Sequence, residues 1–324
     1  MAIALCCTST YLWAQSPVKR GLQAITSDAA RAHIYYLAGD SIEGRGAGSR
    51  GGYIAGEYII SRLREAGVKP LYSDYRQPFD VYGRTYATEP AKAAGGKGSP
   101  ASKEQSPRQT LNNILGVIKG EKSNEIVIVG AHYDHLGRLR KEGSDVIMNG
   151  ADDNASGTAG LLQIMKAFTA TGQRPKRTVI FALWDGEERG MLGSTWFLNH
   201  FADSARIKSY MNLDMMGRNS DEAVPQRFSF LYTTERGNLF ENWFKRYIAK
   251  YGFQLKPDYK PHKTLTDGSD NAPFGLRHIP IVWPHTEGHP DMHRPTDDAA
   301  KINYEKTTEI SRAAFLILWR MANE

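Results

Sequence analysis

Acidic and histidine side chains follow directly after three apolar segments of this chain, and no other feature constrains the fold as strongly. The three are residues 126–129 followed by His132 and Asp134, residues 179–184 followed by Asp185, Glu187 and Glu188, and residues 210–213 followed by Asp214. A carboxylate at the end of a buried strand is costly unless a cation or hydrogen bonds compensate its charge. Sites in open α/β sheets collect at the carboxyl ends of the strands. We therefore expect these side chains to converge on one shared metal site.

The order of predicted elements favours an α/β fold with three layers, in which helices cover both faces of a mixed, mostly parallel twisted sheet. The periodicity of apolar residues separates helices from strands. Predicted helices begin at residue 27 and after residue 154, and others cover residues 50–66, 193–199, 238–251 and 304–321. Predicted strands cover residues 75–87, 113–118, 125–129, 179–184, 210–213, 228–232 and 279–283. The two strands at 113–118 and 125–129 are close enough in sequence to predict a hairpin.

Residues 16–324 are expected to form one domain, because a single large α/β domain can reach this length. The stretch 89–108 is rich in Ala, Gly, Lys, Ser and Pro, which predicts a flexible surface insertion. The net charge of +6 is spread along the sequence, apart from a basic cluster at 138–141. Nucleic-acid binding would need a basic stripe, so this charge pattern disfavours it. Beyond the amino-terminal stretch, no segment is long and apolar enough to span a membrane.

The first fifteen residues, MAIALCCTSTYLWAQ, resemble the apolar part of a signal peptide with a small-residue cleavage site at Ala14. This predicts an exported protein, periplasmic or secreted. Both cysteines of the chain, Cys6 and Cys7, lie in this stretch, so they do not predict disulfides in the folded domain. Lipid anchoring through one of them is a less favoured alternative, because Leu5 is a poor residue before a lipidated cysteine.

A glycine-rich segment, SIEGRGAGSRGG at residues 41–52, invites comparison with phosphate-binding loops. It does not follow a predicted strand, and it lacks the Lys-Ser/Thr ending that phosphate-binding loops carry. We interpret it as a tight turn into the helix at 50–66.

The polar residues after the strands have the composition of a two-metal site. Asp134 lies two residues after His132, where its carboxylate could accept the second imidazole N–H. Asp152 and Asp153 would repel each other unless a cation lies nearby. A bridging carboxylate can hold two metal ions about 3.5–4 Å apart. Nitrogen and carboxylate ligands without thiolate suit Zn²⁺, and Mn²⁺ or Co²⁺ are the substitutes.

Five motifs, GAHYDH, GADDNASG, WDGEERG, NLDMMG and MHRPTD, occur in this order. Together they resemble the co-catalytic zinc aminopeptidases of the bacterial leucyl aminopeptidase and aminopeptidase Y type. The resemblance implies two zinc ions per chain and a cis peptide between Asp152 and Asp153. The implied roles are zinc ligands at His132 and Asp214, ligands of the second zinc at Glu188 and His293, a bridge at Asp152, a general base at Glu187, and a partner of His132 at Asp134. His285 and His289 are alternatives to His293 by spacing alone, but His293 matches the His-x-Pro-x-Asp pattern of the family.

The resemblance implies an exported exopeptidase that removes amino-terminal residues from peptides. A hydroxide bridging the two metal ions would attack the scissile carbonyl, and Glu187 would carry the proton to the leaving amine. Met215, Phe274 and Trp283 are the residues expected to line the substrate pocket. The oligomeric state is not predicted.

Three alternatives remain open at this point. A glutaminyl cyclase has a similar fold with a single zinc ion, and usually has Ser after the bridging-type aspartate, where this chain has Asp153. A carboxypeptidase of the same superfamily would need a basic group for the substrate carboxylate. A non-catalytic binding module on the same scaffold would have lost metal ligands, whereas all of the expected ones are present here.

Overall fold

The structure is a computed structural model that describes residues 16–82, 108–141, 144–219, 221 and 223–324. The expected signal segment at 1–15 lies outside the described residues, and so does the expected insertion at 89–108, except for its last residue. None of the helices in the described part of the chain is both long and apolar enough to cross a membrane.

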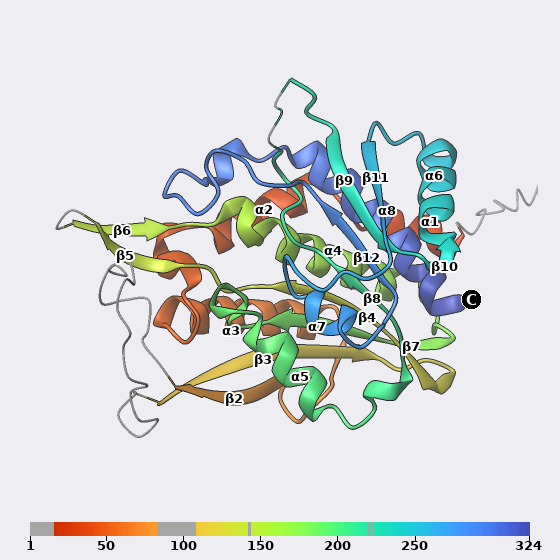
Figure 1. Cartoon of the computed structure of the whole chain (residues 1–324), viewed down its shortest axis with the longest axis horizontal. Helices are drawn as coiled ribbons and strands as arrows, with labels where there is room; N and C mark the ends of the chain where they lie inside the picture. Colours follow the sequence, from red (N-terminus) through yellow and green to blue (C-terminus); the bar gives the residue numbers. More distant parts are fainter. Residues whose placement is uncertain (1–15, 83–107, 142–143, 220, 222) are drawn as a thin grey trace, which may run out of the picture.

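Helices and strands alternate along most of the chain (Figure 1). The α-helices are α1 (Pro17–Gln23), α2 (Ser27–Leu37), α3 (Arg50–Glu65), α4 (Gly157–Ala170), α5 (Leu192–His200), α6 (Leu239–Tyr251), α7 (Ala272–Gly275) and α8 (Tyr304–Asn323). The short helical turns are η1 (Asp40–Arg45), η3 (Ala151–Ser156), η4 (Glu187–Arg189), η5 (Ser204–Arg206) and η6 (Ala299–Lys301). The strands are β1 (Lys69–Pro70), β2 (Arg76–Tyr82), β3 (Arg108–Ile118), β4 (Lys122–His132), β5 (Gly137–Lys141), β6 (Ser144–Met148), β7 (Arg177–Trp184), β8 (Ile207–Asn212), β9 (Arg227–Thr233), β10 (Glu235–Asn238), β11 (Lys256–His262) and β12 (Ile281–His285).

Among the described residues, nine strands form one mixed sheet in the order β1-β3-β7-β4-β8-β12-β9-β11, with β2 paired to β3. The four central strands β7, β4, β8 and β12 run parallel, whereas β3 and β9 are antiparallel to their central neighbours. Strands β5 and β6 form a separate two-stranded hairpin that projects from the body (Figure 1). The predicted hairpin between β3 and β4 is wrong, because β7 lies between them in the sheet.

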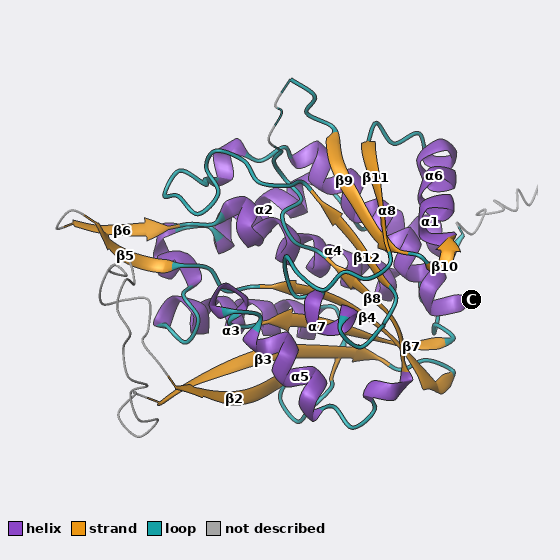
Figure 2. Ribbon diagram, viewed as in Figure 1, coloured by secondary structure: helices purple, strands orange, loops and turns teal. Residues whose placement is uncertain are grey.

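The central strands are buried on both faces. On β4, Val127 and Val129 belong to the core beneath the helices α1, α2, α4 and α8, whereas Ile126 and Ile128 belong to the core beneath α5 and α7. This alternation follows from the two-residue repeat of a strand, and it explains why the strands read as continuous apolar runs. Figure 2 shows helices on both sides of the sheet, so the predicted three-layer α/β fold is confirmed.

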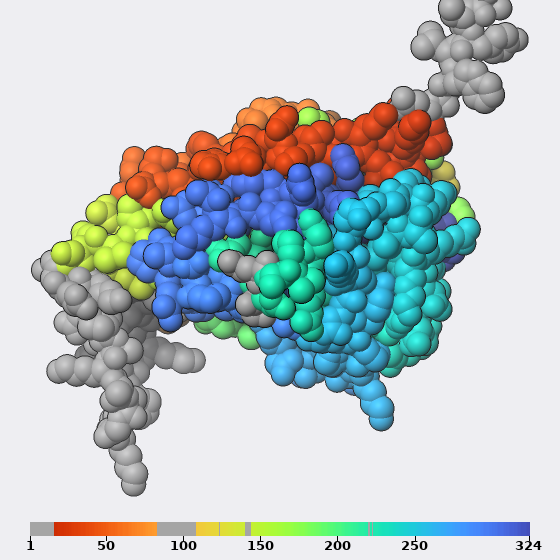
Figure 3. Space-filling model, turned by 90° about the horizontal axis from the view of Figure 1, so that it is seen from above, coloured from red at the N-terminus to blue at the C-terminus, as the bar shows by residue number. Residues whose placement is uncertain are grey.

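The two ends of the described chain pack together. Helices α1 and α2 contact α8, and the space-filling view shows the amino-terminal helices lying along the carboxyl-terminal part of the chain (Figure 3). At Gly21 of α1, an added Cβ would collide with the Phe315 ring of α8.

The parallel arrangement of β7, β4 and β8 brings their carboxyl ends to one edge of the sheet. His132 is the last residue of β4, Asp185 follows β7 directly, and Asp214 lies two residues after β8. In the register of the sheet, Gly130 of β4 is paired with Asn212 of β8. The polar residues that follow the two strands therefore lie near each other along the strand direction.

A buried lysine from α8 fixes the segment that follows β8. The Lys306 ammonium donates hydrogen bonds to the carbonyl oxygens of Arg218 and Arg227, 3.0 and 3.1 Å away, and to Asn219 Oδ1, 2.8 Å away. Burial lowers the pKa of Lys306 to about 8. A buried ammonium is tolerated only where hydrogen bonds compensate it, and these three acceptors do so.

Replacing Lys306 by methionine tests this anchor. Lys306→Met would leave three acceptors without their donor, two of them fully buried, and each buried group of this kind costs about 1–3 kcal/mol. We expect the free energy of unfolding to fall by about 2 kcal/mol or more in urea titrations. Lys166→Met, on the exposed side of α4, is the control and should change it by no more than about 0.5 kcal/mol. Equal losses in the two variants would contradict the anchoring role.

Candidate metal centre

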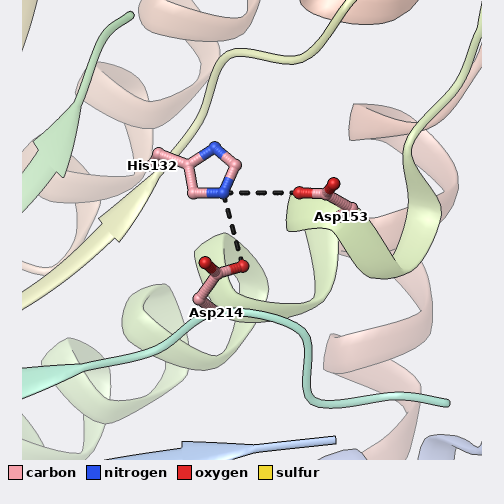
Figure 4. A group of neighbouring side chains, drawn as sticks. All are labelled: His132, Asp153 and Asp214. Atoms are coloured by element: carbon pink, nitrogen blue, oxygen red, sulfur yellow. Dashed lines mark hydrogen bonds and ion pairs between the residues drawn. The ribbon is translucent and has the colours of Figure 1, made fainter. Parts of the chain in front are cut away.

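Three side chains from separate parts of the sequence form the first candidate metal cluster. His132 Nε2 lies 3.3 Å from Asp214 Oδ1 and 3.4 Å from Asp153 Oδ1 (Figure 4). The three come from the end of β4, from η3 and from the segment after β8, and all are buried. One imidazole N–H cannot satisfy two carboxylates at this distance, whereas a single cation could.

A second cluster lies on the other oxygen of Asp153. His293 Nε2 is 2.9 Å from Asp153 Oδ2 and 3.4 Å from Glu188 Oε2. His135 Nδ1 is 2.6 Å from Glu188 Oε1 and 3.9 Å from Asp153 Oδ2. Asp153, Glu188 and His135 offer ligand atoms close enough to hold one ion, and His293 adds a further nitrogen on the half-exposed side.

Asp153 therefore has one oxygen directed to each cluster, and the expected bridge at Asp152 is wrong. The carboxylate of Asp152 is turned to the other side of η3. Its oxygens accept hydrogen bonds from the backbone N–H of Gly217 (2.5 Å) and Arg218 (3.1 Å) and from the Thr286 hydroxyl (3.2 Å). Asp152 thus anchors the segment after β8, and its neighbour faces the metal cluster.

The cis peptide bond also lies one residue later in the sequence than expected. It joins Asp153 to Asn154, not Asp152 to Asp153 as expected. Asn154 holds the turn in place, since its side chain donates to Leu213 O (3.0 Å) and accepts from Gly157 N (2.9 Å). On the opposite side, the Asp297 carboxylate accepts the backbone N–H groups of Asp152 and Asp153, each at 3.1 Å.

Asp134 lies next to the His132 ring, on the side of Nδ1. His132 Nδ1 is 3.2 Å from the backbone oxygen of Asp134 and 3.7 Å from its carboxylate, which is the expected partner. The carboxylate also accepts the backbone N–H of Glu187 at 3.1 Å. Asp134 therefore connects the first histidine to the expected general base.

Glu187 belongs to neither cluster, but charged members of both, His132, Asp214 and Glu188, act on its carboxyl group. Burial raises the pKa of Glu187 to about 10, against the opposing charge of His132. Burial alone would lower the pKa of His132, but the charges of Asp214 and Glu187 raise it well above its usual value. Burial and the charge of Asp153 raise the pKa of Glu188. Several shifted pKa values within one group of side chains are typical of a functional site.

The other two candidate histidines lie next to other polar groups, and neither ring nitrogen of His289 has a hydrogen-bond partner among the described residues. His285 Nδ1 donates to the backbone oxygen of Asp214, 2.8 Å away, and His289 Nε2 lies 3.5 Å from Asp152 Oδ2. Of the three candidates given by the sequence, His293 is the one in contact with Asp153 and Glu188.

The residues expected to line a substrate pocket are almost entirely buried. Phe274 stacks on the Tyr210 ring, with 3.7 Å between ring centroids, and has no exposed surface. It is a core residue, so its expected role as a pocket wall is not supported. Met215 and Trp283 are 2% and 5% exposed. Met215 directly follows Asp214, and the centroid of the Trp283 ring lies 4.5 Å from that of the His285 ring.

The donor atoms present fit zinc. Imidazole nitrogens and carboxylate oxygens without thiolate suit Zn²⁺. His135 adds a buried Nε2 that has no hydrogen-bond partner among the described residues. His132, Asp153 and Asp214 would hold one ion, and Asp153 and Glu188 with His293 or His135 would hold a second. His135 was missed in the sequence, although it directly follows the recognised His132–Asp134 pair.

Curated relatives align with part of the chain. A probable leucine aminopeptidase 2 of Arthroderma benhamiae is 34% identical over 180 residues, which are 53% of this chain and 33% of the relative. A probable glutamate carboxypeptidase of the same organism is 33% identical over 136 residues, which are 40% of this chain and 17% of the relative. The chain thus spans about a third or less of the length of these relatives.

Solved structures share the whole fold at low sequence identity. A zinc aminopeptidase from Bacillus subtilis has a TM-score of 0.70 at 18% identity, covering 92% of this chain and 96% of that one. A glutaminyl cyclase from Fimbriiglobus ruber has a TM-score of 0.66 at 16% identity, covering 91% of this chain and 95% of that one. At such identities the similarity shows the fold alone.

The family model described as Peptidase family M28 matches residues 113–318. This range contains β4, η3, η4 and the segment after β8, and with them every residue of the two clusters. The resemblance seen in the five motifs is thereby confirmed at the level of the family, and the chain belongs to peptidase family M28.

Proposed function

We propose that this protein is a dinuclear zinc aminopeptidase. The observation that carries the proposal is the position of Asp153, with one oxygen 3.4 Å from His132 and the other 2.9 Å from His293. A carboxylate shared in this way is what two neighbouring metal ions require. The similarity to a probable leucine aminopeptidase supports removal of amino-terminal residues.

Some residues of the site would bind the metal ions, and Glu187 would transfer the proton. Bound zinc would polarise the scissile carbonyl and lower the pKa of water at the site. With zinc bound, the neighbouring positive charge would favour the ionised form of the Glu187 carboxyl, which would then take a proton from the attacking water and deliver it to the leaving amine. The hydrogen bond from the Glu187 N–H to Asp134 holds the base at the cluster.

A single-zinc glutaminyl cyclase is the nearest alternative. With the bridge at Asp153, the following position that usually holds Ser in cyclases is Asn154, not Asp153. Asn154 spans the turn with its amide, so this chain still departs from the cyclase pattern. The second cluster around Glu188 is the structural feature that favours two ions.

A carboxypeptidase is the second alternative, because one curated relative is named as a probable glutamate carboxypeptidase. It would need a cationic group to bind the substrate carboxylate. Arg218 is buried and its guanidinium lies 3.1 Å from Asp291. The charge of this arginine is therefore already paired within the protein.

Export is proposed from the apolar stretch at residues 1–15. Amino-terminal sequencing of protein recovered from the culture medium or periplasm tests it. A mature chain starting near residue 15 would support it, and retention of Met1 in the cytoplasm would contradict it.

Activity on a defined set of substrates tests the proposed reaction. We expect the protein to release the chromophore from unblocked aminoacyl-anilides, and a chelator to abolish the release. Amino-terminal acetylation of the same substrates should block it. Formation of pyroglutamate from a peptide with amino-terminal Gln, without hydrolysis of the anilides, would support the cyclase alternative instead.

Substitution of two neighbouring glutamates distinguishes the proposed general base from a proposed metal ligand. Glu187→Gln should keep two zinc ions and a similar thermal midpoint, yet lose about 10²–10⁴-fold in kcat, because only the proton carrier is removed. Glu188→Gln should lose zinc together with activity, because its carboxylate belongs to the second cluster. The measurements are zinc content per chain and steady-state kinetics. The assignment would be reversed if Glu187→Gln lost zinc and Glu188→Gln retained it.

A further inference from the structure

The glycine-rich segment at residues 41–52 packs against the base of the β5–β6 hairpin (Figure 1). A Cβ at Gly44 would collide with the carbonyl oxygens of Met148 and Gly137. A Cβ at Gly51, in the first turn of α3, would collide with Ile42 O. Ser49 caps α3 by accepting the Gly52 N–H at 3.1 Å, which confirms that the segment leads into the helix. The glycines allow η1 to approach the segments that carry the metal cluster.

Arg45 is the one charged residue of this segment that is entirely buried. Its guanidinium donates hydrogen bonds to the carbonyl oxygens of Tyr133 (3.0 Å), Asn149 (2.7 Å), Gly150 (2.9 Å) and Leu37. All four acceptors are backbone carbonyls, so the planar array of N–H donors fixes the path of the chain.

Three of these acceptors belong to the two segments that supply metal ligands. Tyr133 lies between His132 and Asp134, while Asn149 and Gly150 lead into η3 and Asp153. The backbone of Arg45 adds a further link, because its carbonyl oxygen accepts the N–H of His135 at 3.1 Å.

The charge of Arg45 also faces the acidic site. Burial lowers the pKa of Arg45 to about 10, although the carboxylates of Asp153, Asp297, Asp134 and Glu188 act to raise it. The guanidinium is therefore charged at neutral pH. By Coulomb's law alone, a cation that interacts with these carboxylates would repel zinc.

We propose that Arg45 is a positioning residue for the metal centre, which joins the His132–His135 segment to the segment before Asp153 and so sets their separation. The inference rests on the proposed zinc site. The charge of Arg45 and its positioning role predict opposite changes in zinc affinity. Removing the charge alone would strengthen zinc binding, whereas removing the positioning contacts should weaken it.

Zinc affinity of folded variants tests the proposal. The affinity is measured by competition with a chromophoric chelator, after near-ultraviolet circular dichroism has shown that each variant is folded. Arg45→Met should weaken zinc binding about 10–100-fold, the range found for residues that orient metal ligands. Arg45→Lys keeps the charge but has three donors in place of five, so it should also bind zinc more weakly than the wild type. If Arg45→Met does not fold, Arg45→Lys carries the test.

Arg312→Met is the matched control. Arg312 donates two hydrogen bonds to Ile25 O, 2.8 and 3.1 Å away, in a contact between α8 and the segment after α1. This variant should lose stability and keep the wild-type zinc affinity. Unchanged or tighter zinc binding in Arg45→Met, wild-type affinity in Arg45→Lys, or an equal loss in Arg312→Met would overturn the proposal. A wild-type protein that binds no zinc would overturn both this inference and the proposed function.

Discussion

The buried carboxylate of Asp153 is the interaction on which the rest of the site depends. Its two oxygens face different histidines, so its position sets where both clusters lie. A carboxylate with almost no exposed surface needs strong compensation. Burial alone would raise the pKa of Asp153, but the hydrogen bonds from His132 and His293 hold it well below the usual value. The surrounding structure holds this one side chain in place.

Several neighbouring residues hold the Asp153 carboxylate and its backbone in position. Asp297 and Asn154 fix the backbone of η3 on its two sides, and Asp152 ties it to the segment after β8. Lys306 anchors that segment from α8. Arg45 links η3 to the residues after β4. The parallel strands bring the site residues to the same edge of the sheet. The buried polar contacts then fix the positions of the individual side chains, as a rigid catalytic site requires.

The sequence was sufficient to predict which strands carry the site, because carboxylates directly after buried apolar strands are costly unless a cation compensates them. The motifs placed the bridge at Asp152, one residue before the carboxylate that faces both clusters. Which of two adjacent carboxylates faces the metal depends on the path of η3, which has no regular two-residue repeat. His135 was missed for a related reason, since its contact with Glu188 joins segments that are 53 residues apart. The β3–β4 hairpin prediction failed because nothing in the two segments themselves indicates that β7 lies between them.

Anomalous X-ray diffraction at the zinc absorption edge, on crystals of the zinc-loaded protein, tests the bridging role of Asp153 most directly. We expect two anomalous peaks about 3.5–4 Å apart, one on each side of the Asp153 carboxylate. His132 and Asp214 should contact one of them, and Glu188 the other. A single peak, or two peaks bridged by Asp152 with Asp153 turned away, would contradict a dinuclear centre built on Asp153.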